Sequence, residues 1–199
     1  ARTWYGLFYL VVATNNFEEG IVQLEKAIEI DPLSPYVIGL HACALSMAGR
    51  DQEAISTTNQ LVRLNPKSWI SILLHGLCLL RGGETEKCIE VHLKGLEILD
   101  GQIWNLVQLV HAYATLGQLD LAERHYQEMI ERYEKQYLPP SALAMTAAKL
   151  GDVDRALRLA QEAVDINDPF LFNSVNNFWP TAEDLNNLPN FKAIFGNHQ

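Results

Sequence analysis

Two cysteines and two histidines stand at spacings that suit a metal site. His75 and Cys78 are three residues apart, and Cys88 and His92 are four residues apart. On a helix, either spacing places both side chains on one face. Two such helices in an antiparallel hairpin can surround a tetrahedral zinc ion with two thiolates and two imidazoles, which are usual zinc ligands. A zinc site is therefore one hypothesis for the chemistry of this chain.

The alternative is that these four side chains fill the interior. Cys88 falls in a column of small residues that recurs along the chain, and Cys78 should project from its helix differently from His75. One and two repeats away, the positions of His75 and His92 are occupied by Leu7, Leu109, Leu24 and Tyr126. We therefore expect no metal and no cofactor, with His75, Cys78, Cys88 and His92 kept as the alternative metal site.

No other arrangement of residues indicates catalysis. The sequence has no G-x-S-x-G motif, no glycine-rich loop that would cradle a phosphate, and no cysteine in a recognisable nucleophile context. The acidic pairs at Glu18-Glu19 and at Glu84 and Glu86 come at the starts of expected helices, where they complement the helix dipole. We predict that the chain is not an enzyme.

The composition is that of a folded protein with an acidic surface. Of 199 residues, 48% are hydrophobic and 20% charged, and the net charge is −9. The basic residues are scattered singly, so we expect neither nucleic acid nor an anionic membrane as partner. No apolar run has the length of a membrane span. Three cysteines, no glycosylation sequon and no signal peptide before the first repeat favour a cytoplasmic location.

The positions of all these residues follow from a repeat of 34 residues. One column of the repeat holds small residues: Gly20, Ala54, Cys88, Ala122 and Ala156. A second column holds residues that tolerate left-handed backbone: Asn15, Gly49, Gly83, Gly117 and Gly151. A third column is apolar: Ile28, Val62, Leu96, Ile130 and Val164. The register continues through five rows without an insertion.

Each row predicts a pair of helices. An apolar-periodic segment of about a dozen residues runs up to the glycine, and a second one follows and ends near Pro or Asp. The small residue lies where the two helices cross, because a large side chain there would separate them. A single hairpin cannot bury both of its apolar faces, so neighbouring hairpins must stack. The pattern predicts an all-α repeat protein.

The second helix of each row resembles the tetratricopeptide repeat (TPR) family. The resemblance is carried by Asn15 to Pro32, by Gly117-Gln118-Leu119-Asp120-Leu121-Ala122 and by Gly151-Asp152-Val153-Asp154-Arg155-Ala156. The first helices match less closely; repeat four offers Leu106, Leu109, Val110 and Tyr113. The resemblance implies a right-handed α-solenoid of five TPR hairpins at about 1–34, 35–68, 69–102, 103–136 and 137–169. Residues 170–199 would form a short C-terminal helical cap.

Two regions depart from the family pattern. Repeats three and four lack the closing proline, and we expect the second helix of repeat four to continue through Tyr137 until Pro139-Pro140 stop it and start the next helix. The segment from Asp184 to Phe195 resembles a tail that follows such repeats in multidomain bacterial signalling proteins. In those proteins the repeats are commonly fused to a nucleotide cyclase, a kinase or a winged-helix domain.

The resemblance also implies a binding face, because first helices of this family line a concave surface that takes peptides. Reading the inward positions from the repeat register gives these candidate partner-binding residues: Tyr5, Tyr9, Tyr36, Leu73, Leu77, Trp104, His111 and Met145. They favour a partner with an apolar or aromatic anchor. The few inward cations, Arg2, Arg81 and Lys149, are too far apart to grip one carboxylate. The phenylalanine-rich tail or a neighbouring molecule would cover this face equally well.

Two functions are consistent with these residues. The first is a protein-interaction scaffold that binds a peptide or partner domain on an apolar and aromatic concave face, with possible self-association. The alternative is a regulatory segment of a larger signalling enzyme, a cyclase, kinase or winged-helix regulator, that contacts another domain of its own chain. The first predicts binding in trans; the second predicts that removing the repeats changes the activity of that other domain.

Overall fold

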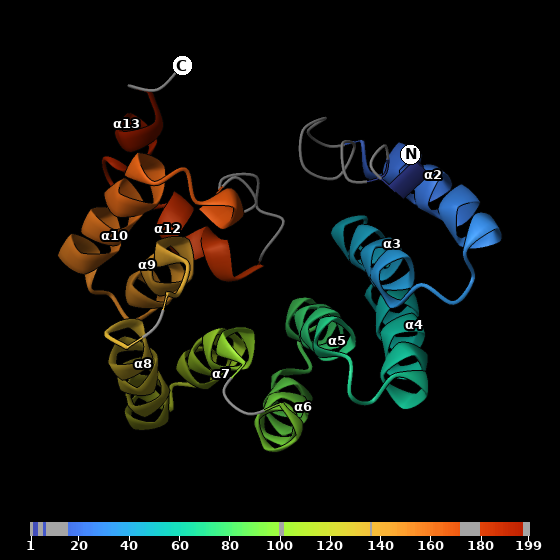
Figure 1. The fold of residues 1–199 in the computed structure, drawn as a ribbon, viewed down its shortest axis with the longest axis horizontal. Helices are drawn as coiled ribbons and strands as arrows, with labels where there is room; N and C mark the ends of the chain where they lie inside the picture. The colour runs from blue at the N-terminus through green and yellow to red at the C-terminus, as the bar shows by residue number, and fades with distance from the viewer. Residues whose placement is uncertain are drawn as a thin grey trace. The chain divides into compact units, whose positions relative to one another are not determined.

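The computed structural model describes residues 2–3, 6, 16–99, 102–135, 137–171 and 180–196 (Figure 1). All regular secondary structure in these ranges is helical. The predicted all-α class is therefore confirmed. Among the helices of these ranges, none has both the length and the apolar character needed to cross a membrane.

The helices follow the repeat register. The second helices of the five rows begin 34 residues apart: α2 (Phe17–Ile30), α4 (Asp51–Leu64), α6 (Thr85–Ile98), α8 (Leu119–Tyr133) and α10 (Val153–Asp165). Four first helices precede the last four of these: α3 (Pro35–Met47), α5 (Trp69–Arg81), α7 (Ile103–Thr115) and α9 (Pro140–Lys149). Four of the five predicted repeat hairpins are therefore present, and most of the first helix predicted for row one lies outside the described residues.

The helices belong to two compact units, Ala1–Gln102 and Ile103–Gln199. In the first, the N-terminal unit, α3 packs on α4 and α5 on α6, and the two first helices α3 and α5 lie side by side. In the second, the C-terminal unit, α7 packs on α8, α9 packs on α10, and α7 contacts α9. Within each unit, a first helix packs on the preceding hairpin, as α5 does on α3 and α4 and α9 does on α7 and α8, so neighbouring hairpins stack.

The glycine column ends the first helices. Gly49, Gly83, Gly117 and Gly151 all have left-handed backbone, with φ between +72° and +81°. After each glycine the next amide donates back to the helix; Arg50 N lies 2.9 Å from the carbonyl oxygen of Leu45. This bond satisfies a carbonyl that the helix end leaves without a partner. The predicted role of the glycine column is confirmed at these four positions.

The small column lies at the centre of each hairpin. Ala54, Cys88, Ala122 and Ala156 are fully buried, and Gly20 is also buried. At these positions the two helices of a hairpin approach closely, so only a small side chain fits between them. This explains why Cys88 appears in a column otherwise made of alanine and glycine.

The junction between repeats four and five differs from the sequence prediction. Helix α8 ends at Tyr133, and Glu134 and Lys135 form a turn, so the predicted continuation through Tyr137 is wrong. Helix α9 begins at Pro140, as predicted, which is three residues later than the register. Proline suits this first helical position because its missing N–H would have no helical partner.

A buried carboxylate joins α9 to the chain that follows α10. Asp168 accepts hydrogen bonds from the backbone N–H of Ser141 at 3.0 Å and of Phe170 at 2.9 Å. Ser141 is in the first turn of α9, where amides have no helical acceptor. The side chain of Asp168 therefore substitutes for the cap that Pro139 cannot supply.

The C-terminal segment forms the predicted helical cap. It contains the short 3-10 helix η1 (Pro180–Ala182), then α12 (Glu183–Asn186) and α13 (Phe191–Gly196). Helix α12 packs on α9, and α13 packs on α10. Leu185 and Phe191 are fully buried in these contacts. The cap thus covers apolar surface that the last repeat would otherwise expose.

Candidate protein-interaction surfaces

The predicted partner-binding residues lie in different environments. Tyr5 and Tyr9 are outside the described residues. Tyr36, in the first turn of α3, is 43% exposed. The remaining five side chains are all at most 5% exposed: Leu73, Leu77, Trp104, His111 and Met145. Their role in partner binding stays a prediction, and a partner could reach these five only after whatever covers them has moved.

In the C-terminal unit, the chain's own C-terminal part contacts the predicted face. The ring of Phe170 lies 4.8 Å from the ring of Trp104 between centroids, at an angle of 53°. Thr181 Oγ1 lies 3.8 Å from the sulfur of Met145. One turn further along α9, the Lys149 ammonium pairs with the Asp184 carboxylate at 3.3 Å. The sequence was consistent with either an open or a covered face. In the described part of this unit, the chain's own C-terminal residues cover it.

Burial also determines the charge of His111. Burial, together with the nearby Lys149 ammonium, lowers the pKa of His111 to about 3. A hydrogen bond with the backbone of Met145 raises this pKa by a smaller amount. The imidazole is therefore neutral near pH 7, so it offers one nitrogen donor and one nitrogen acceptor.

In the N-terminal unit, large apolar side chains are exposed where second helices end and first helices begin. We call them the apolar edge, and they are Ile30 (75% exposed), Leu33 (81%), Tyr36 (43%), Leu64 (76%) and Trp69 (44%). Ile30 and Leu64 are equivalent positions one repeat apart, at the ends of α2 and α4. Because α3 and α5 lie side by side, an exposed aliphatic residue at the end of a second helix occurs at two successive junctions between repeats.

Only Tyr36 of the apolar edge was identified from the sequence. The other four lie in or beside turns, whereas the prediction counted inward positions along helices. A signal was nevertheless present, because Ile30 and Leu64 precede the Asp-Pro and Asn-Pro turns at equal distance in two repeats. A leucine or isoleucine at the last position of an amphipathic helix, just before a proline turn, has little chance of burial.

The alternative zinc site is not assembled among the described residues. No group of three or more His, Cys, Asp or Glu side chains lies close enough together there to hold a metal ion. Nδ1 of His75 lies 2.9 Å from Thr58 Oγ1, and the imidazole of His92 lies against the backbone of Gly76. Cys88 occupies the helix crossing. His75, Cys78, Cys88 and His92 are all buried in the interior of the described structure.

The protonation of these side chains agrees with an interior role. Burial lowers the pKa of His75 to about 4 and raises the pKa of Cys88 to about 12. The pKa of Cys78 is also raised, chiefly by the neighbouring thiol of Cys43 and by burial. Both cysteines therefore remain thiols near pH 7, and a thiol is a poor metal ligand compared with a thiolate.

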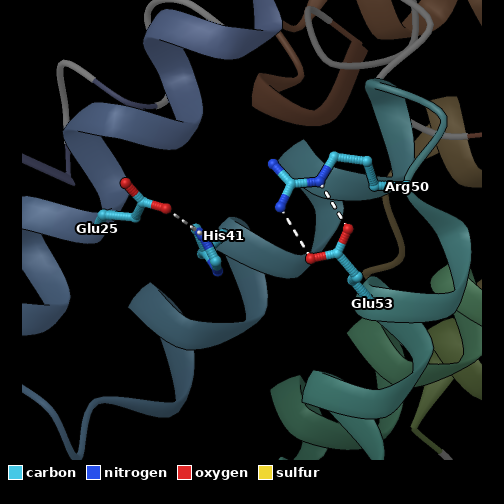
Figure 2. A network of polar contacts seen from close by, with 4 residues as sticks. All are labelled: Glu25, His41, Arg50 and Glu53. Carbon is cyan, nitrogen blue, oxygen red and sulfur yellow. Dashed lines mark hydrogen bonds and ion pairs between the residues drawn. The ribbon is translucent and has the colours of Figure 1, made fainter.

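A polar network connects α2 to α3 and marks the start of α4 (Figure 2). His41 Nε2 lies 3.8 Å from a Glu25 carboxylate oxygen, across the α2–α3 contact. Arg50 makes two hydrogen bonds of 2.8 Å with the Glu53 carboxylate. Arg50 and Glu53 are both exposed, so their pair contributes little to stability. The Glu25–His41 pair joins two neighbouring helices and the Arg50–Glu53 pair lies at a helix start, positions that indicate a structural role for both pairs.

Comparison with known proteins agrees with the helical architecture. No model of a protein family matches the chain. The chain is 28% identical over 87 residues to small glutamine-rich tetratricopeptide repeat-containing protein 2 of Mycosarcoma maydis, a match that covers 44% of this chain and 25% of that protein. The chain therefore spans a quarter of the length of this curated relative.

Two solved structures are similar over most of the chain. A thermophilic TPR protein of Thermus thermophilus superposes with a TM-score of 0.66 at 18% identity, over 92% of this chain and 97% of that one. A chain in the structure of Naa15/Naa10 bound to HypK-THB has a TM-score of 0.50 at 14% identity, over 75% of this chain and 22% of that one. With the repeat hairpins described above, these likenesses show that the chain has the fold of tetratricopeptide-repeat proteins.

Proposed function

We propose that the chain is a protein-interaction scaffold and that the apolar edge of the N-terminal unit contributes the main anchors. The partner is a protein or peptide segment that carries apolar or aromatic side chains. The observation that carries this proposal is the exposure of five large apolar side chains at two successive junctions between repeats. Exposed apolar clusters of this kind commonly mark interaction surfaces.

The composition of the edge suits binding energetics. Aromatic side chains such as Tyr36 and Trp69 bury large areas and lose few rotamers, so they recur among the residues that dominate interfaces. Burying one fully exposed aliphatic side chain contributes about 1.5–3 kcal/mol. Two or three anchors therefore offset a substantial part of the entropy that association costs. Tyr36 also belongs to the face predicted from the repeat register, so the edge and that face share a residue.

The fold supports the proposal in a general way. Stacked hairpins present long surfaces that single globular domains of the same length do not. The similar chain in the Naa15/Naa10 structure belongs to a complex bound to HypK-THB, so this helical arrangement occurs there within a protein assembly. We infer that this chain also binds a protein partner, and that its own exposed residues determine which partner it binds.

A displayed library of random short peptides tests the proposal even while the partner is unidentified. The immobilised wild-type chain should enrich peptides with aromatic or aliphatic anchors. Affinity for the enriched peptides should then fall at least about tenfold in Trp69→Ala and in Leu33→Ala, because each removes an exposed anchor. Leu119→Ala is the matched control, since Leu119 is also exposed but lies in the C-terminal unit.

Two results would contradict the proposal. One is enrichment of peptides without apolar anchors; the other is equal affinity of wild type, Trp69→Ala and Leu33→Ala for the enriched peptides. If no peptide is enriched at all, the alternative function gains support, in which the repeats regulate another domain of a larger signalling enzyme by contact within one chain.

A further inference from the structure

Two rows of side chains on α7 and α9 form one surface in the C-terminal unit. On α7, Trp104, Gln108 and His111 share a face because their spacings are four and three residues. On α9, Ser141, Met145 and Lys149 share a face for the same reason. The two rows meet where His111 lies near Met145 and Lys149. We call these six residues the α7–α9 seat.

The chain's own C-terminal part occupies this seat at both ends. The tilted ring of Phe170 contacts the ring of Trp104, and Asp184 pairs with Lys149. Between these ends, Thr181 lies against the sulfur of Met145. The next residue after Asp184 is Leu185, which is fully buried. The occupant therefore combines one carboxylate with an adjacent apolar anchor on a helix of only four residues, α12.

The fit between seat and occupant is incomplete in its hydrogen bonds. Gln108 is fully buried, yet neither its amide nitrogen nor its amide oxygen has a partner in the part of the chain that the structure describes. The same holds there for Nε2 of His111 and Oγ of Ser141. A buried polar atom without a partner lowers the stability of the arrangement that buries it, roughly 5- to 100-fold in an equilibrium constant.

We propose that the C-terminal segment 180–186 is an exchangeable occupant of the α7–α9 seat, which opens to bind a partner peptide carrying an acidic residue followed by an apolar one. The partner would also bring polar groups that reach Gln108, His111 and Ser141. A second copy of this chain is a less suitable occupant, because its C-terminal segment would leave the same polar atoms unpaired. The seat lies in the other unit from the apolar edge, so this proposal stands even if the edge binds nothing.

The probe for exchange is a labelled peptide with the sequence of residues 180–196, added to the full chain. Wild type should bind it weakly, because the segment in cis already fills the seat and only the open fraction is competent. Leu185→Ala in the chain removes the buried anchor of the cis segment and leaves every seat residue intact. The probe should then bind about 30-fold more tightly or better. Leu119→Ala, an exposed leucine of the same unit, should leave probe affinity unchanged.

Two further variants test the chemistry of the seat. In the Leu185→Ala background, Lys149→Glu should weaken the probe, and a probe carrying lysine in place of its Asp184 should recover part of the loss. In the same background, Gln108→Met should tighten the probe about fivefold, because the probe, like the segment in cis, leaves the buried amide of Gln108 unpaired. If segment 180–186 covered the seat permanently, none of these changes in probe affinity would occur.

Folding and oligomeric state are checked beside affinity. If Leu185→Ala loses its helical signal, Asp184→Lys is tested in its place. Asp184 is partly exposed, and loss of its ion pair with Lys149 should tighten probe binding by about two- to fivefold. Unchanged probe affinity in folded Leu185→Ala or, where that variant unfolds, in Asp184→Lys overturns the proposal. A wild-type dimer that dissociates in Leu185→Ala also overturns it, because a second copy would then be the occupant.

Discussion

Mild acid should destabilise this protein through two buried histidines. His75 on α5 and His111 on α7 are both nearly inaccessible to solvent. Burial lowers the pKa of His75 to about 4, and burial with the adjacent Lys149 ammonium lowers the pKa of His111 to about 3. In the unfolded chain both imidazoles regain their ordinary pKa of 6.5. The unfolded state therefore binds more protons than the folded state at any pH between these values.

The sign and size of the effect follow from that difference. A depressed histidine pKa gives stability that is fully present above pH 6.5 and is lost as the pH falls toward the folded value. At about pH 5 each histidine is protonated only after unfolding, about 1.5 pH units below its unfolded pKa. Each then destabilises its unit by about 2 kcal/mol, at 1.36 kcal/mol per pH unit.

Urea unfolding followed by far-UV circular dichroism measures this loss at about pH 7.5 and about pH 5. Because His75 and His111 belong to different units, each unit should lose about 2 kcal/mol. The variants His75→Gln and His111→Gln should each reduce the loss in their own unit by about 2 kcal/mol, and the lowered pKa values of His41 and His125 leave a smaller pH dependence. Equal unfolding free energies at the two pH values would show that these histidines do not control acid stability, as would a His75→Gln variant that keeps the full pH dependence of the N-terminal unit.

Three substitutions test the packing of the repeats by the same urea measurement, compared with the exposed control Leu121→Ala. Gly117→Ala should destabilise by about 1 kcal/mol, because φ there is +72°; no loss would contradict the left-handed turn. Ala122→Leu should cost about 1–3 kcal/mol by overpacking the helix crossing, and a neutral result would exclude a tight crossing. Asp168→Ala should cost about 1–3 kcal/mol by leaving two backbone amides unpaired, and Asp168→Asn clearly less; equal losses would contradict its role as a shared cap.

The features of the fold that repeat could be predicted from the sequence. Gly49 and Gly83 stand in one column because each row needs left-handed backbone at the same place. Ala54 and Cys88 stand in another because each hairpin crosses at the same place. A constraint that recurs five times along the chain is visible in a single sequence, since each row serves as a comparison for the others.

Features that occur once could not be predicted in this way. The end of α8 at Tyr133 depends on the turn at Glu134 and on the late start of α9, and no other row has two prolines there. The contact of Phe170 with Trp104 joins a repeat helix to a segment outside the repeat. The register fixes the direction of Trp104 but contains no information about what lies against it. Four members of the apolar edge were missed because they lie in or beside turns, where the phase of a helix does not predict which side chains are buried.

Hydrogen–deuterium exchange of the wild-type chain, with and without a library-selected peptide, tests the scaffold function most directly. We predict slower exchange at residues 30–36 and 64–70, which carry the apolar edge, since a partner that covers their side chains also restricts the adjoining backbone. The Trp69→Ala variant should lose this protection at the same peptide concentration. Protection confined to other segments, or unchanged in Trp69→Ala, would contradict the claim that this edge is where the chain binds its partner.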